Sequence, residues 1–475
     1  MAATNEDQGP HQEASKYFWE ARTDHQSSDW VAQFGIKLSH WVPNPLTDVY
    51  FTPRTLHHDL AGYTPTRIEI ALPHAEWERK DSWFEETFRH LYWATYTFSV
   101  RRFGQHNFRL PMGRSPWADA ELSPQFLSFA SQLSRQDPLV GGWDHVLKDK
   151  THRACLVTGI ISKVLVENVF NELLWGATDQ QTWFLRAHDE ATLSDDGFKR
   201  TKRRAQIVRD MLGGDLLSPN FWPRVDALAY QVTSLLLPLI NFQGQQTPTE
   251  KWPGLMVIYQ ELHDIIAEAA YFSICIRLSH TIFHIEYPEP GDKWELDYSH
   301  LEPEHIYQKS KSKGQKYDMR QGNDDSRRYQ RIAKVKVIAW PQIKRHEPLG
   351  SVEHYGAENG QRVALVSRCE VAYYYGMSDD QGEMWERKPT LTEHVLSSKK
   401  TTHRIDQARS FLIPTLGLLA VISLSALISP NNVLLRGFYN ISYGVWWAIA
   451  AVIGGLLQII GGSLRTIFGG PIAGP

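Results

Sequence analysis

Two histidines, His280 and His284, have the spacing that comes closest to a chemical motif in this 475-residue sequence. Residues four apart share one face of a helix, and two such imidazoles form the core of a helical zinc site. The intervening HTIFH lacks the glutamate of the H-E-x-x-H motif, and the third ligand, His263 or Glu286, is left open. Two histidines on a core helix are more often packed and hydrogen-bonded. We therefore treat the pair as a weak metal candidate and expect no cofactor.

Motifs for nucleophiles or phosphate binding do not occur in the sequence. There is no G-x-S-x-G, no P-loop and no G-x-G-x-x-G, and neither Cys155 nor Cys369 has a local nucleophile pattern. Catalytic groups can assemble from distant positions, so an enzyme stays open as an alternative, although no catalytic residue is predicted. The three cysteines, which include Cys275, are sparse and far apart, which is typical of a reducing compartment.

A basic segment is the strongest candidate for a functional surface. Residues 309–345 hold twelve lysines and arginines against three aspartates, a net charge of +9. Because residues 308–331 lack hydrophobic periodicity, we expect a loop there, which either lies on anionic lipid or is simply solvated. The lipid interpretation relies on Lys309, Lys311, Lys313, Lys316, Arg327 and Arg328. Few aromatics separate these charges and the whole chain carries −3, so we do not expect nucleic-acid binding.

Helical periodicity dominates the first 290 residues. The capping-box pair Ser82 and Glu85 predicts a helix start, after which aromatic side chains recur every four residues. This stripe belongs either to the core or to a ligand pocket. Further helices are predicted over 143–175, 197–212, 224–241 and 253–285. Charged residues and a proline interrupt the last two, which favours buried helices of a soluble bundle over membrane spans.

Strand patterns are shorter and lie mostly after residue 330. Apolar and polar residues alternate over 66–72, and β-branched and aromatic residues gather in 335–339, 352–355 and 362–374. Asn359-Gly360 is a hairpin turn signal between the last two segments. We therefore expect a small β meander after the helical region.

The last 65 residues contain two uncharged apolar runs, 411–429 and 438–460. Their 19 and 23 residues span about 28 and 34 Å as helices, which matches a hydrocarbon core of about 30 Å. The short connector PNNVLLR predicts a hairpin, which either crosses fully or re-enters. Five basic residues flank the chain ends against Arg436 in the connector, which predicts that both ends are cytosolic at an intracellular or plasma membrane.

The second apolar run presents small residues that favour close helix packing. Ala448, Ala451, Gly455 and Gly462 provide seven- and four-residue spacings at which helix backbones approach in lipid. The packing partner is either the first span or a second copy of the chain. Homo-oligomerisation therefore stays open.

Together these patterns predict an α+β fold that is mainly α. The expected parts are a flexible tail (1–28), a helical domain (29–290), a basic linker (291–331), a β subdomain (332–380), a connector (381–410), two spans (411–429 and 438–460) and a terminal tail (461–475). The leading hypothesis is a membrane-anchored binding, scaffold or regulatory protein with a protein or anionic-lipid partner. A membrane-tethered enzyme is the alternative. An oligomeric channel subunit is disfavoured, because neither span carries a charge.

Overall fold

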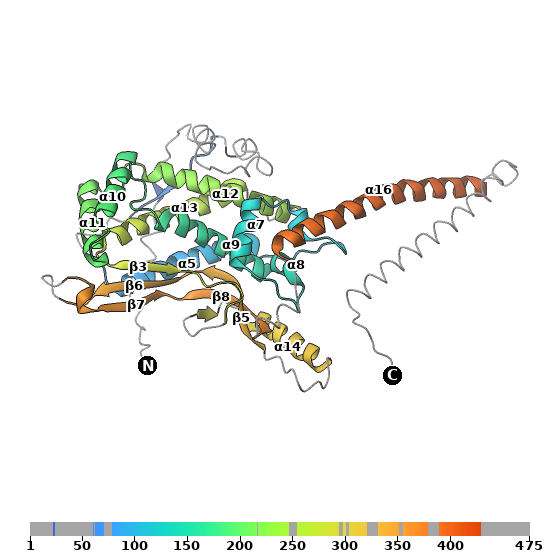
Figure 1. The fold of residues 1–475 in the computed structure, drawn as a ribbon. Coiled ribbons are helices and arrows are strands. Elements are labelled where there is room, and N and C mark those ends of the chain that lie inside the picture. The colour runs from blue at the N-terminus through green and yellow to red at the C-terminus, as the bar shows by residue number, and fades with distance from the viewer. Residues whose placement is uncertain are drawn as a thin grey trace, which may run out of the picture. The chain divides into compact units, whose positions relative to one another are not determined.

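The computed structural model describes residues 22–23, 60, 62–70, 78–215, 217–246, 254–293, 298–300, 304–320, 331–350, 355–378 and 389–428. The chain divides into two compact units, Met1–Ser398 and Lys399–Pro475. Within the first unit, Figure 1 shows the helices gathered over one face of the strands, with α14 beyond the β5–β8 end. Helix predominates over strand in the described residues, which confirms the mainly helical class.

Helices are the main described elements of the first unit. They are α5 (Asp81–Phe103), α6 (Pro116–Asp119), α7 (Pro124–Leu133), α8 (Gly142–Lys148), α9 (Lys150–Leu165), a π-helical turn (Val166–Phe170), α10 (Asp179–Ala191), α11 (Gly197–Leu212), α12 (Phe221–Gln246), α13 (Leu255–Leu278) and α14 (Glu304–Arg320). The last helix, α16 (Leu391–Ile428), begins in the first unit and continues into the second.

The strands form two small sheets and one short ladder. β3 (Ile282–Glu286), β6 (Gln342–Pro348) and β7 (Gln361–Ser367) pair antiparallel in the order β3-β6-β7. In the second sheet, β8 (Cys369–Met377) lies between β5 (Arg331–Trp340), to which it is antiparallel, and β4 (Tyr298–His300), to which it is parallel. The ladder pairs β1 (Arg22–Thr23) with β2 (Arg67–Ile68).

A small region of mainly antiparallel sheet is present, but its strand order is not the predicted β meander and its strands have different bounds. Only Pro341 separates β5 from β6 and only Arg368 separates β7 from β8, so each pair is a single extended stretch that changes sheet at a bend. The strand predicted at 362–374 is therefore two strands. Residues 351–354 lie outside the described residues, and Tyr355 is not in a strand. Asn359-Gly360 does precede β7, at the end of a longer connection that includes a 3₁₀ turn.

The aromatic stripe of α5 is part of the core. Phe84 and Phe88 are fully buried, and the Phe88 ring lies 4.3 Å from that of Phe272 on α13. The helix starts at Asp81 and its N-cap side chain makes no capping hydrogen bond, so the predicted capping box is wrong. Tertiary packing of the aromatic stripe therefore stabilises the start of α5 without a capping box.

The long helix predicted over 143–175 is broken into three pieces. Asp149 ends α8 and caps α9, because its carboxylate accepts from the first backbone amides of α9. The π-helical turn then ends the run at Phe170. Periodicity alone cannot detect this break, because the apolar stripe continues across the cap.

The polar segment 304–320 is a helix, so the predicted loop over 308–331 is wrong in its described part. Ser310 and Gly314, one turn apart, face β8: the Ser310 Oγ accepts from the Tyr375 amide at 3.0 Å. A Cβ on Gly314 would lie 2.7 Å from Cδ1 of Tyr375. Two small residues make this packing face, so the hydrophobic pattern that predicts a helix is absent.

Helix α12 is long and apolar enough to cross a membrane by composition, and 72% of its most apolar window is buried inside the protein. This burial agrees with the predicted core helix. In α16, the first turn packs on the first unit: Leu391 and Val395 are buried, and His394 Nε2 lies 2.8 Å from Asp144 Oδ1 on α8. The helix then runs through most of the first predicted span, and the second span lies outside the described residues.

Candidate functional site

The histidine pair of the sequence does not form a helical metal site. Helix α13 ends at Leu278, so His280 lies in a bend and His284 lies on β3; the predicted shared helix face is wrong. The stretch IFHIE alternates like a strand, and β6 pairs with it along its whole length. Across the described residues, no group of three histidines, cysteines or acids could hold a metal ion.

A different cluster of titratable groups lies where β5 meets α8 and α9, and it begins with Lys336. The pairing of β5 with β8 shifts between Val335 and Val337, so Lys336 sits in a β-bulge. Bulges re-aim side chains and are frequent near functional sites. The Lys336 carbonyl accepts from the Arg135 amide at 2.8 Å. Its side chain is fully buried, and its Nζ has no hydrogen-bond partner among the described residues.

The first turn of α9 adds a carboxylate–imidazole pair. The Asp149 Oδ1 accepts from the backbone amides of Thr151 and His152 at 3.0 and 3.1 Å, and lies 3.0 Å from Nδ1 of His152. In the neutral ring this contact places the proton on Nδ1 and leaves the lone pair on Nε2. His152 is fully buried, and its Nε2 has no partner in the described part of the chain.

The second histidine, His145, is positioned by a two-glycine turn at the start of α8. Gly141 and Gly142 have φ angles of 74° and 57°, a backbone conformation that favours glycine. A Cβ on Gly141 would lie 3.2 Å from the Cβ of His145. The rings of His145 and His152 are 4.9 Å apart, edge to face. The His145 Nδ1 is buried and has no partner within the described ranges, although the residue as a whole is half-buried.

A close helix–strand contact holds these groups together. Gly159 lies two turns after His152 on the same face of α9. A Cβ at Gly159 would lie 2.2 Å from the carbonyl oxygen of Ile338 on β5, so a larger residue would push α9 away from the strand. This glycine therefore fixes how near the first turn of α9 comes to Lys336.

The electrostatics of the cluster follow from burial and from one positive charge. Burial, reinforced by the charge of Lys336, lowers the pKa of His152 to about 3 in spite of Asp149. The same two causes lower the pKa of His145 to about 4. Burial also lowers the pKa of Lys336 to about 8, against the opposing charges of Asp137 and Asp149. At neutral pH both imidazoles are neutral and Lys336 keeps its proton. The arrangement can bind an anion or exchange a proton.

A second buried histidine, His263, has a carboxylate near each ring nitrogen and gives a structural reference, although only its Nε2 is hydrogen-bonded among the described residues. Its Nε2 lies 2.9 Å from Asp226 Oδ1, its Nδ1 lies 3.9 Å from Asp264 Oδ1, and its ring stacks on Trp222. Burial lowers the pKa of His263, but the hydrogen bond to Asp226 and the contact with Asp264 outweigh it and raise the pKa overall. This group is held within α12 and α13 as an internal carboxylate–imidazole pair.

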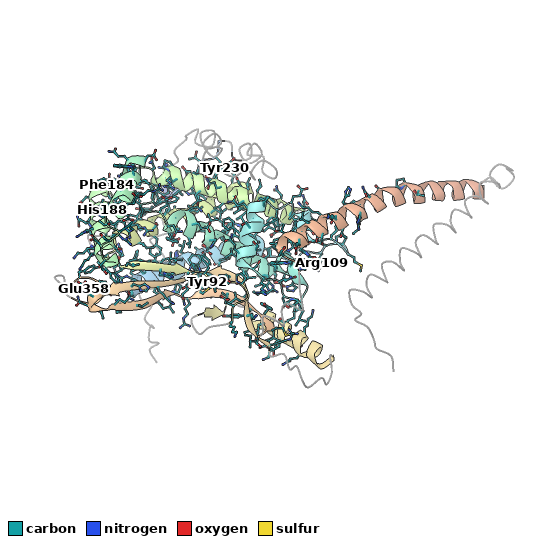
Figure 2. The ribbon with its side chains drawn as sticks, in the orientation of Figure 1. Tyr92, Arg109, Phe184, His188, Tyr230 and Glu358 are labelled. Atoms are coloured by element: carbon teal, nitrogen blue, oxygen red, sulfur yellow. The ribbon has the colours of Figure 1, made fainter. Side chains whose placement is uncertain are left out.

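The predicted lipid-binding residues are partly described. Lys309, Lys313 and Lys316 are exposed on α14 and Lys311 is half-buried, while Arg327 and Arg328 lie outside the described residues. The helix-packing set Ala448, Ala451, Gly455 and Gly462 also lies outside them. The other basic cluster, on α11, makes ion pairs: Lys199 Nζ lies 3.1 Å from Glu358 Oε1, at the end of the unit where Figure 2 labels Glu358, Phe184 and His188.

The chain matches no protein-family model, no curated protein and no solved structure.

Sequence reasoning missed the Lys336 cluster, although one signal was present. Lys336 stands between Val335 and Val337, and the four residues that follow it in the strand are apolar and buried, so a lysine there is unusual. In the sequence it belongs to the basic segment, residues 309–345. The structure separates them, because Lys336 turns into the protein while the lysines of α14 are outside.

Proposed function

We propose that the protein is a membrane-anchored binding module in which the first unit, Met1–Ser398, recognises a partner at the cytosolic face of a membrane. One observation carries the anchor: α16 is a single helix from Leu391, which is buried in the first unit, to Ile428, which lies in the apolar run. A continuous helix that changes from charged to apolar sequence at Phe411 suits a protein that leaves water and enters lipid.

Alkaline carbonate extraction of native membranes tests the anchor. The full chain should stay in the membrane pellet, and a chain that stops after residue 405 should become soluble. A chain that stops after residue 436 keeps only the first apolar run, and we expect it to stay in the pellet as well. Membrane retention of the chain ending at 405 would contradict the proposal, because it would require insertion of a helix such as α12.

The surface of α10 supports the binding role. Its Trp183 and Phe184 are 70% and 47% exposed, and large exposed aromatics are typical of interface anchors. Proximity labelling from the N-terminus in native membranes should recover fewer partners when both are changed to alanine. Trp93, which is 53% exposed on α5, provides a control substitution to alanine. Equal labelling by the wild type and both variants would show that α10 does not contribute to partner binding.

Helix α14 is proposed as a contact with anionic lipid. Its exposed lysines project from a helix held by Ser310 and Gly314, so their removal should leave the fold intact. Changing the six basic residues at 309, 311, 313, 316, 327 and 328 to glutamine should abolish salt-sensitive binding of the chain ending at 405 to anionic liposomes. A control with Lys199, Lys202 and Arg203 changed to glutamine should still bind. Equal binding by both variants would leave α14 as a solvated helix.

A further inference from the structure

We propose that Lys336, His145 and His152 form a binding site for a small oxyanion, a carboxylate or phosphate group. The main evidence is that Lys336 Nζ, His145 Nδ1 and His152 Nε2 are all buried and have no hydrogen-bond partner among the described residues. Buried polar groups are normally paired, and a buried ammonium without a partner is costly. Three such atoms on neighbouring side chains of α8, α9 and β5 indicate one common ligand.

All three unpartnered atoms are nitrogens, which favours an anion over other ligands. The Lys336 ammonium has three protons to donate, and a neutral His145 can carry its proton on Nδ1. A metal ion is disfavoured, because the ammonium repels it and no group of three protein ligands exists in the described residues. The ionised oxygens of a carboxylate or phosphate accept hydrogen bonds and match this donor set.

Asp149 allows His152 to join as a third donor. Its carboxylate already holds Nδ1–H of His152, so a proton added at Nε2 makes an imidazolium between two negative groups, Asp149 and the bound anion. The other charged groups around the cluster are Asp137 after α7 and Lys309 on α14, both of which affect the pKa of Lys336. Binding should therefore take up protons and be tighter at pH 6 than at pH 8.5.

Burial limits the size of the ligand and suggests where it enters. Lys336 and His152 are completely buried, so a bulky headgroup or a peptide side chain attached to a folded partner does not reach them. His145 and Asp149 are half-buried and form the outer edge of the cluster. The charge of the exposed Lys309 acts on both His145 and Lys336, and it raises the local concentration of anions. A small, freely diffusing oxyanion fits these limits. This inference does not depend on the membrane anchor.

Equilibrium dialysis of the detergent-solubilised full chain against radiolabelled inorganic phosphate, and separately against radiolabelled acetate, tests the site. At constant ionic strength and pH 6, we expect saturable binding of at least one of the two, with at least tenfold weaker binding at pH 8.5. The variant Lys336→Met should lose the binding. Lys163→Met on α9, whose ammonium lies instead near Glu167 and Tyr287, should keep it. No saturable binding of either anion at pH 6 would overturn the proposal.

If Lys336→Met does not fold, a variant at the half-buried His145 still tests the site. His145→Gln preserves neutrality and approximate size at the outer edge, and it should weaken binding several-fold. The unfolding midpoint of the wild type should also rise with phosphate or acetate concentration, since a ligand that binds only the folded chain stabilises it. Equal binding by the wild type and by His145→Gln, or an equal rise of the midpoint in the wild type and both site variants, would contradict the site.

Discussion

His263 and His152 are both completely buried, and each lies beside an aspartate, yet their pKa values shift in opposite directions. His263 faces two carboxylates, Asp226 and Asp264, which outweigh the effect of burial. His152 faces Asp149 on one side and the ammonium of Lys336 on the other. The sign of the second neighbour therefore decides the direction in which the pKa of a buried imidazole shifts.

The comparison also distinguishes the α12–α13 group, which stabilises the fold, from the Lys336 cluster, which is arranged to bind a ligand. The α12–α13 group has its charges compensated within the protein, and a stacked Trp222 covers the ring. The cluster of α8, α9 and β5 has donors in excess of acceptors. A protein retains such an excess at a cost in stability when a ligand supplies the missing acceptor.

Breaking the pair of Asp226 and His263 should have the largest effect. Asp226→Ala leaves the imidazole of His263 buried beside one distant carboxylate, and loss of one partner of a buried pair costs about 3–5 kcal/mol of unfolding free energy. Chemical denaturation monitored by tryptophan fluorescence measures the change. Asp210→Asn on the exposed side of α11 serves as the control and should change stability by less than about 0.5 kcal/mol. A small effect at Asp226 would show that His263 is neutral.

Lys336→Met should act in the opposite direction. Replacing a buried charged group by an apolar side chain of similar length should stabilise the ligand-free chain by about 1–3 kcal/mol, because the desolvation cost disappears. The same denaturation experiment in buffer without oxyanions measures it, with Lys163→Met as the control. Destabilisation by Lys336→Met would mean that the ammonium is satisfied inside the fold, which would remove the contrast between the two clusters.

Gly159→Ala tests the contact that brings His152 to Lys336. The added methyl meets the carbonyl oxygen of Ile338, and overpacking of this kind costs about 1–3 kcal/mol. Gly197→Ala is the matched control, since its Cβ would make an ordinary contact of 3.4 Å with Ile282. Thermal unfolding should distinguish the two substitutions. A neutral result at Gly159 would show that α9 can move away from β5 without loss.

The pH dependence of the unfolding free energy tests the opposite pKa shifts of His152 and His263. His152 has a folded pKa of about 3 and an unfolded pKa near 6.5, so its contribution is present above 6.5 and is lost as pH falls toward 3, by about 1 kcal/mol per pH unit. His263 has a raised folded pKa, so its contribution is full below 6.5 and is lost as pH rises from 6.5 through the higher folded pKa. His152→Gln should flatten the acid side of the stability profile, and His263→Gln the alkaline side. Identical profiles for both variants would contradict the opposite shifts.

The sequence predicted the parts of the fold in which apolar spacing decides the structure. The stripes of α5 and α11 and the buried faces of α12 are visible in the residues, since packing follows periodicity. Helix α14 was missed because Ser310 and Gly314 make its packing face, and the end of α13 was missed because its apolar run continues into β3. The Lys336 cluster was missed because it depends on a bulge and on three segments that are distant in sequence. The second apolar run and its small residues lie outside the described residues.

The ionisation of Lys336 itself tests the central claim most directly. Carbon-13 NMR of the full chain, labelled at the lysine Cε and compared with Lys336→Met to assign the signal, gives the pKa of this ammonium. The account predicts a value of about 8 without oxyanions and a clearly higher value in saturating phosphate or acetate, because a bound anion stabilises the charged form. An ordinary value near 10.5 without anions, or a lowered value that neither anion changes, would contradict it.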